Sequence, residues 1–426
     1  MIPVPFEEVE ALGLGVLDGE PPARVVTRIH ADSRVARPGD LFVALNTGVR
    51  YLGDARERGA ATLLPGDQHA ALAALAGLVR ARSSARVVAV VGSTGKTSTK
   101  DILGALCAAV TPTVFAEASQ NNEIGLPLTV CRLEPETRVL VAELGMRGLG
   151  QIAELCAIVQ PHVALVTQIG PEHLELVGTV ENVARANAEA IEALPPGGIA
   201  VVPAGEPLLE PYLRRDDLEV RRFEAAGVER AAEGWRFAVG GREVVLRLPF
   251  DSRHMAANAL AALTAYDALG LPLDRAQEGA SQIRLSRWRG EELPLPGGGF
   301  VVNDAYNANP SSVRAALEDL AERADGRRRL AFLGGMAELG DTAPGYHRAA
   351  AALAGSLGIE VVAVGELARL YGAERWVADA DAATALAGDL LRPGDAVLVK
   401  ASRAVGLEGI PARLANIAAE WAISGR

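Results

Sequence analysis

The chain has 426 residues, of which 49% are hydrophobic and 22% are charged. At about 150 residues per domain this length predicts about three domains, and the composition excludes an intrinsically disordered chain. Lys and Arg number 42 against 53 Asp and Glu, a formal net charge of −11; this argues against a general nucleic-acid-binding protein, which would need excess basic side chains to neutralise phosphates.

The basic residues are almost all arginine, because lysine occurs only at Lys96, Lys100 and Lys400. A lysine kept in such a chain is a candidate for a role that a guanidinium cannot fill, since its ammonium is a compact point charge. The three cysteines form no CxxC pair, which is typical of a reducing compartment. The acidic start does not resemble a signal peptide, and no uncharged apolar run reaches the roughly 18 residues of a membrane span. We therefore expect a cytoplasmic protein without a membrane span.

Residues 1–82 form the first predicted unit. Short strands are expected at 24–29 and 41–44, and an Ala/Leu-rich stretch predicts a helix at 70–82. An Arg/Ser patch at 80–86 predicts a linker to the second unit. Short strands combined with a helix predict a small α/β domain.

The second predicted unit, 83–292, begins with a continuous apolar run at 87–91. Such a run is typical of a strand buried on both faces of a parallel sheet. Further strands are predicted at 138–141, 162–167 and 199–202, a β-meander at 223–248, and helices at 183–194 and 256–269. This alternation of strands and helices predicts a three-layer α/β domain.

The third predicted unit, 293–426, alternates apolar β-branched runs with Ala-rich helical stretches. The runs lie at 300–303, 329–333, 360–364 and 396–400. They predict a second α/β domain with a parallel sheet. The predicted fold class is therefore α/β throughout, in three domains.

A glycine-rich loop, Gly92–Thr97, connects the strand at 87–91 to a predicted helix. This context favours a phosphate-binding loop, because glycines let backbone N–H groups approach a polyphosphate at a helix N-terminus. Lys96 can reach the β and γ phosphates, and the Thr97 hydroxyl can bind Mg²⁺. The alternative is an ordinary strand-to-helix turn, because Val90 occupies the first glycine position of the full GxxxxGK[ST] form.

Two further polar residues follow predicted strands of the second unit. Glu143 ends the strand that begins at 138, and His173 lies after the strand at 162–167. A carboxylate beside a phosphate loop is a candidate ligand of the Mg²⁺ that accompanies a nucleotide. A histidine in a loop is by itself weaker evidence for a metal.

Together these motifs resemble those of the Mur ligases, the ATP-dependent amide-bond enzymes of cell-wall precursor synthesis, and in particular the branch that adds D-alanyl-D-alanine. The matching segments are 32–34 with 38–45 in the first unit, and 92–97, 121–127, 143–146, 173–175, 254–262, 304–312, 334–340 and 394–403 in the other two. The most specific is DAYNANPSS at 304–312. The resemblance covers nearly the whole chain and implies a small UDP-sugar-binding domain, a central P-loop mononucleotide-binding domain and a C-terminal Rossmann-like domain that binds the amino substrate and closes on ATP.

The resemblance also implies roles for single residues. The implied ATP contacts are Gly92, Ser93, Thr94, Gly95, Lys96, Thr97, Ser98, Asn258, Arg287 and Asp304, with Arg289 as a competing choice for Arg287. The implied substrate contacts are Ser33, Arg34, Asn121, Asn122, Tyr306, Asn307, Asn309, Pro310, Lys400 and Arg403. For Ser33 and Arg34 a plain polar turn is the alternative. Lys96 and His173 are the implied catalytic residues.

Two Mg²⁺ ions are implied, one held by Thr97 and Glu143 and a second by His173. The family's carbamoylated lysine falls 14 residues after His173, where this chain has Asn187. Asn has no amine, so we expect no lysine carbamate. Our hypothesis is that His173, substrate oxygens, water and the Asn187 carbonyl hold the second ion; the alternative is that Asn187 is an ordinary helix-face residue.

The implied function is that of an acid–D-amino-acid ligase. It would join D-alanyl-D-alanine to UDP-N-acetylmuramoyl-tripeptide through an acyl phosphate, releasing ADP and phosphate, as a monomer in the cytoplasm. One alternative is another ligase of the same superfamily, such as the third-residue ligase or a folylpolyglutamate synthase-like enzyme. A P-loop ATPase that uses hydrolysis as a conformational switch is the other; it explains 92–97 but not the motifs of the third unit.

Overall fold

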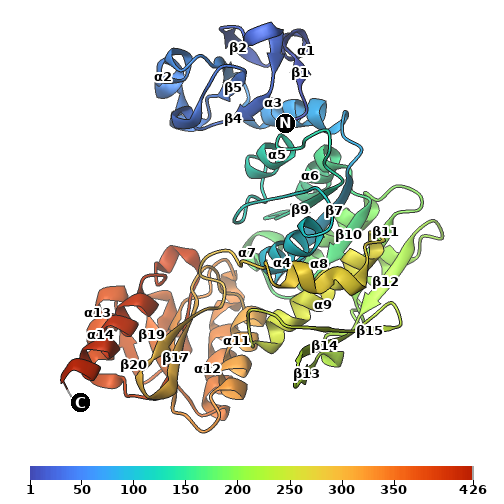
Figure 1. Cartoon of the computed structure of the whole chain (residues 1–426). Coiled ribbons are helices and arrows are strands. Elements are labelled where there is room, and N and C mark those ends of the chain that lie inside the picture. Colours follow the sequence, from blue (N-terminus) through green and yellow to red (C-terminus); the bar gives the residue numbers. More distant parts are fainter. Residues whose placement is uncertain (425–426) are drawn as a thin grey trace.

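The computed structural model describes the backbone of residues 1–424 and the side-chain surroundings of residues 1–418. Its elements fall into three groups along the chain, seen as blue, green and orange-red parts in Figure 1, with the green part in the middle. Each group has its own sheet of four or more strands. No helix among the described residues is long and apolar enough to cross a membrane.

The first group carries a four-stranded sheet in the order β2-β6-β5-β4 and a small β1-β3 pair. Its elements are β1 (Val4–Pro5), α1 (Phe6–Ala11), β2 (Gly15–Asp18), β3 (Val25–Val26), β4 (Arg28–His30), β5 (Asp40–Val43), α2 (Leu52–Glu57), β6 (Ala61–Pro65) and α3 (Gln68–Arg80). Helix α3 begins at the cap Asp67, whose side chain accepts hydrogen bonds from two backbone N–H groups. It packs against α5 and α6 of the next group, which anchors the first group to the second.

The second group is built on a parallel six-stranded sheet in the order β12-β11-β10-β7-β9-β8. Its strands are β7 (Arg86–Val91), β8 (Thr113–Phe115), β9 (Val139–Glu143), β10 (Val163–Val166), β11 (Ile199–Pro203) and β12 (Glu219–Phe223), and its meander is β13 (Glu229–Ala231), β14 (Gly234–Val239) and β15 (Arg242–Leu246). Its helices are α4 (Lys96–Ala108), α5 (Gly125–Val130), α6 (Gln151–Val159), α7 (Leu174–Val177), α8 (Val180–Glu192), α9 (Arg253–Ala268) and α10 (Ala276–Ala280).

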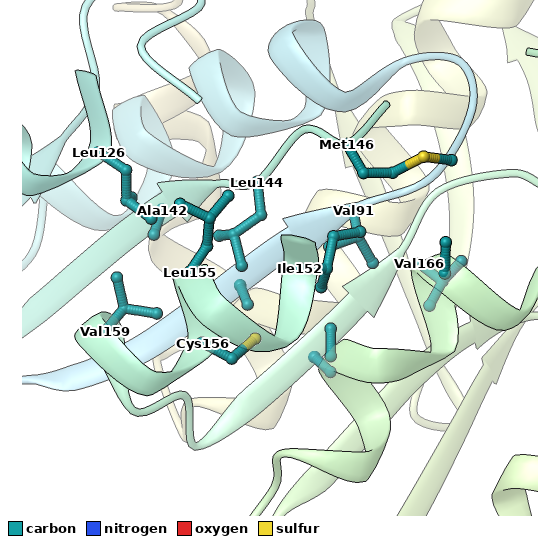
Figure 2. Packing of buried hydrophobic residues seen from close by; sticks show 14 of the residues in the cluster. Val91, Leu126, Ala142, Leu144, Met146, Ile152, Leu155, Cys156, Val159 and Val166 are labelled. Atoms are coloured by element: carbon teal, nitrogen blue, oxygen red, sulfur yellow. The ribbon is translucent and has the colours of Figure 1, made fainter. Parts of the chain in front are cut away.

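Alternate residues of the central strand β7 point into two different cores, as the period of a strand requires. Val87, Ala89 and Val91 belong to a core that contains residues of α5, α6 and α8, whereas Val88 and Val90 pack with α4 and α9. Figure 2 shows the first of these cores, with side chains of α6 lying over the sheet. Burial on both faces explains why this strand is apolar throughout.

The third group has a six-stranded sheet, β16-β17-β21-β18-β19-β20, that is parallel except for β16. Its strands are β16 (Glu291–Leu295), β17 (Gly299–Asp304), β18 (Arg329–Gly334), β19 (Ile359–Val364), β20 (Arg375–Val377) and β21 (Ala396–Lys400). Its helices are α11 (Pro310–Arg323), α12 (Ala343–Ser356), α13 (Ala380–Leu390) and α14 (Ile410–Ser424). The α/β fold class expected from the sequence is thus confirmed in all three groups.

Two details differ from the sequence interpretation. Phe223 was expected to begin the meander, but it ends β12, which pairs in parallel with β11. The division expected between 292 and 293 cuts β16, which pairs with β17 from Glu291 onward. The third sheet therefore begins at Glu291.

Candidate active site

A cavity of about 920 Å³ lies where the second and third groups meet. It opens at the carboxyl ends of β7, β9 and β10 of the central sheet and of β17 and β21 of the third sheet, the edge at which parallel α/β sheets bind ligands. Of the residues predicted from the sequence, it is lined by Ser93, Thr94, Gly95, Lys96, Thr97, Ser98, Asn121, Asn122, Glu143, His173, Asn258, Asp304, Tyr306, Asn307, Asn309 and Lys400.

Six predicted residues lie outside this lining: Ser33, Arg34, Gly92, Arg287, Pro310 and Arg403. Pro310 is the first residue of α11, and the Arg34 guanidinium forms an ion pair with the Asp32 carboxylate in the first group, 2.7 Å away.

The arginine that reaches the cavity is the competing choice, Arg289, not Arg287. The Arg287 guanidinium lies over the ring of Trp288. Arg289 donates from Nη2 to Ser119 Oγ at 3.1 Å and stacks over the ring of Tyr306.

The phosphate loop depends on two glycines with positive φ. A Cβ at Gly92 (φ +126°) would lie 2.2 Å from Thr167 Oγ1, and one at Gly95 (φ +88°) would lie 2.4 Å from Asn258 Oδ1. Only glycine fits such positions without displacing a neighbour. The close approach of Asn258 to Gly95 places this side chain of α9 directly beside the loop.

The Lys96 ammonium is paired inside the protein. It donates to the Gly92 carbonyl and to Glu172 Oε1, the latter at 3.1 Å. Burial alone would raise the pKa of the Glu172 carboxyl, but the nearby Lys96 ammonium and His173 imidazole outweigh it and hold that pKa below its usual range. Glu172 is thus an ionised, buried carboxylate facing the phosphate loop.

Asn187 does not face the cavity but supports the phosphate loop from behind. Its Oδ1 accepts a hydrogen bond from the Gly92 N–H at 2.6 Å, and its Nδ2 donates to the Val183 carbonyl at 2.8 Å. The side chain is buried, with the residue 1% exposed. Its carbonyl is therefore already occupied, which argues against our expectation that this oxygen helps to hold the second metal ion.

Glu143 has the features of a metal ligand. Its Oε1 accepts hydrogen bonds from Thr97 Oγ1 at 2.9 Å and from Asn121 Nδ2 at 2.8 Å. Its Oε2 is buried and has no hydrogen-bond partner among the described residues. A buried carboxylate oxygen without a donor is costly, so the Thr97 hydroxyl and Glu143 together fit a hard cation such as Mg²⁺.

His173 is held between two carboxylates. Its Nδ1 contacts Glu338 of the third group, and its Nε2 lies 3.5 Å from Glu172 Oε1. Burial would lower the pKa of His173, but the two carboxylates outweigh it and raise that pKa. Both His173 (φ +51°) and Glu338 (φ +60°) have left-handed backbones, which non-glycine residues adopt at a cost and mainly at functional positions.

The third group supplies a second set of polar side chains. Lys400 Nζ pairs with Asp304 Oδ2 at 2.5 Å and donates to the Asn307 carbonyl at 2.9 Å. The Asn309 side chain reaches the phosphate loop, where its Nδ2 donates to the Ser93 carbonyl at 3.2 Å. The third group therefore touches the loop directly.

Sequence reasoning did not single out Glu172 or Glu338. Glu338 lies in the 334–340 segment that carried the family resemblance, so its motif was a signal. Glu172 carried no signal beyond its position next to His173.

Comparison with known proteins agrees with this geometry. Residues 90–266 match the family described as Mur ligase middle domain, and residues 288–403 match the Mur ligase, glutamate ligase domain. The chain is 31% identical to the UDP-N-acetylmuramoyl-tripeptide–D-alanyl-D-alanine ligase of Bacillus subtilis (strain 168), over 76% of each chain. Its fold is similar to MurF from Acinetobacter baumannii (TM-score 0.84, 28% identity, 97% of this chain and 99% of that one). It is also similar to MurF ligase from Thermotoga maritima in complex with ADP (TM-score 0.81, 26% identity, 92% and 98%).

Proposed function

Because this chain belongs to the Mur ligase family, we propose that it is the ATP-dependent ligase that joins D-alanyl-D-alanine to UDP-N-acetylmuramoyl-tripeptide in peptidoglycan synthesis. The observation that carries the proposal is the shared cavity, in which the phosphate loop of the central group faces Asp304, Tyr306 and Asn309 of the third group. A P-loop ATPase switch would need only the wall of the cavity formed by the central group, and not the wall formed by the third group. Another ligase of the superfamily would share both walls and differ in the amino substrate.

The reaction needs an activated carboxylate, because a carboxylate oxygen is a poor leaving group. The substrate carboxylate attacks the γ-phosphorus of ATP, ADP leaves, and an acyl phosphate forms. The free amine of D-alanyl-D-alanine then attacks the acyl carbon, phosphate leaves and a proton is lost. Phosphoryl transfer requires mainly positioning and charge neutralisation, which the backbone of 92–97 and the Lys96 ammonium supply.

We propose that Thr97 and Glu143 hold one Mg²⁺ and that His173 contributes to a second. The orphaned Glu143 oxygen supports the first assignment. A bound Mg²⁺ neutralises phosphate charge and lets two anions approach each other. Since Asn187 cannot become a carbamate, turnover should be the same with and without added bicarbonate; clear stimulation would contradict this.

The remaining substrate contacts are proposals as well. We propose three domains that start at residues 1, 83 and 291, with Ser33 and Arg34 of the first contacting the UDP-sugar. Asn121 and Asn122 lie on the central wall of the cavity and Lys400 on the opposite wall, so they would contact the substrates between them. We further propose a cytoplasmic monomer.

The decisive experiment measures phosphate release from ATP. Release should require UDP-N-acetylmuramoyl-tripeptide and D-alanyl-D-alanine together. Release without either substrate would favour the ATPase switch. Release with a different amino acid in place of D-alanyl-D-alanine would favour another ligase of the superfamily.

A further inference from the structure

Glu172 lies at the contact between the phosphate loop and His173. It sits in the loop between β10 and α7, its side chain is 8% exposed, and it lines the cavity. Its Oε1 is 3.1 Å from Lys96 Nζ and 3.5 Å from His173 Nε2. One carboxylate therefore faces both the phosphate-binding cation and the imidazole.

The orientation of His173 leaves Nε2 as the nitrogen that faces Glu172. Nδ1 is taken by the Glu338 carboxylate, and the Glu175 N–H donates to the Glu338 carbonyl at 3.1 Å, which fixes the two loops to each other. A carboxylate on one imidazole nitrogen is the usual way in which a protein orients the other nitrogen toward a metal. Glu338 is thus a positioning residue for His173.

Nucleotide binding changes the surroundings of Glu172. A polyphosphate on the loop draws the Lys96 ammonium toward its own oxygens, and Glu172 then loses its nearest cation. A buried carboxylate without a counter-charge is strongly unfavourable. Asn187, the neutral residue at the back of the loop, supplies no charge and has its carbonyl occupied by Gly92.

We propose that Glu172 is a ligand of the second Mg²⁺, which it shares with His173 Nε2, and that Lys96 holds this carboxylate until ATP binds. The inference rests on the proposed function only in that ATP and Mg²⁺ occupy the cavity. Carboxylate oxygens are the protein ligands that Mg²⁺ prefers. The exchange keeps Glu172 paired in both states, first with an ammonium and then with a divalent cation.

The test counts bound ions without any peptide substrate. The full-length protein and its Glu172→Gln variant are titrated with Mn²⁺ in the presence of a non-hydrolysable ATP analogue, and free Mn²⁺ is measured by electron paramagnetic resonance. We expect two ions for the native protein and one for Glu172→Gln, with the affinity of the second site lowered at least ten-fold. Glu136→Gln, a change at an exposed carboxylate, should retain both ions.

Two bound ions of unchanged affinity in Glu172→Gln would overturn the proposal. A crystal structure of the native protein with Mn²⁺ and the same analogue gives an independent answer if the variant does not fold. Direct coordination of the second ion by Glu172 supports the proposal, and a Glu172 that stays on Lys96 overturns it. Because no peptide substrate is present, a wrong assignment of the amino substrate would change the phosphate-release assay and leave this ion count unaltered.

Discussion

Lys100 is fully buried, and its ammonium joins helix α4 to the loop that leads into the Asn121 segment of the cavity. It donates to the carbonyls of Ala116 at 2.6 Å and Ala118 at 2.9 Å, and it pairs with Asp101 at 2.5 Å. As one of only three lysines it was a candidate for a special role, but the sequence did not show that it is buried. In the structure, its hydrogen bonds to Ala116 and Ala118 tie this loop to helix α4.

We expect Lys100→Met to lower the free energy of unfolding by about 3–5 kcal/mol, because it leaves the Asp101 carboxylate buried without its cation. Urea unfolding followed by circular dichroism measures this. Arg348→Met, a change at an exposed position, serves as the control and should stay within about 0.5 kcal/mol of the native protein. A loss below about 1 kcal/mol for Lys100→Met would show that Asp101 is satisfied by other donors.

Helix α12 supports the active-site loop through a buried histidine. The Met336 N–H donates to His347 Nε2 at 2.9 Å, and His347 Nδ1 lies 2.7 Å from the Ala343 carbonyl. The ring is therefore neutral, with its proton on Nδ1, and burial lowers the pKa of His347. Because Met336 lies in the same loop as Glu338, this hydrogen bond helps to hold in place the carboxylate that contacts His173.

This lowered pKa makes part of the stability depend on pH. Between the folded pKa of His347 and its unfolded value of about 6.5, the unfolded chain binds more protons, so the free energy of unfolding falls as the pH falls below about 6.5. The slope from one such group is at most about 1.4 kcal/mol per pH unit. Urea unfolding of the native protein and of His347→Gln from pH 8 to pH 5.5 should give a stability difference that is largest above pH 6.5 and shrinks below it. A difference that is constant with pH would contradict a neutral buried His347.

The elements that the sequence predicted well are those whose burial shows in the local pattern. β7 and β21 are continuous apolar runs in the interior of their sheets, and both were predicted within a residue or two. β12 is an edge strand whose residues Glu219, Arg221 and Arg222 interrupt the apolar pattern, so its pairing with β11 was not visible. An edge strand pairs with only one neighbour and can leave one face exposed. Its sequence therefore carries only a weak apolar pattern.

The same reasoning applies to the site. The phosphate loop and Glu143 could be predicted because strand, loop and helix are contiguous in the chain. Glu172 could not, because its partner Lys96 lies 76 residues earlier, and nothing in a Pro-Glu-His sequence shows that the carboxylate is buried. Asn187 was identified only by its spacing from His173, and that spacing could not show its bond to Gly92, which depends on the packing of α8 behind the loop.

At the scale of the whole molecule, the third group is docked on the phosphate loop through the first turn of α11. Asn309 caps this helix by accepting the Ser312 N–H at 2.8 Å. The same side chain donates from Nδ2 to the Ser93 carbonyl at 3.2 Å and to Thr94 Oγ1 at 3.1 Å. One side chain therefore caps the start of a helix of the third group and is hydrogen-bonded to the phosphate loop of the second.

This double role can be separated with a residue that caps a helix but cannot reach the loop. Asn309→Ser retains a good N-cap and removes the two hydrogen bonds to the loop. Since such bonds are worth about 0.5–1.5 kcal/mol each, the arrangement with the third group docked on the loop should become about five- to 150-fold less populated relative to arrangements in which the third group has moved away from the loop. Small-angle X-ray scattering should then show a larger radius of gyration, and the KM for ATP should rise while the melting temperature stays nearly constant.

Ser312→Ala is the control variant. It weakens the helix cap without touching the Ser93 contact, so it should lower the melting temperature and leave the radius of gyration unchanged. An Asn309→Ser protein that is as compact as the native one would show that the other contacts, such as that between Glu338 and His173, suffice to hold the third group in place.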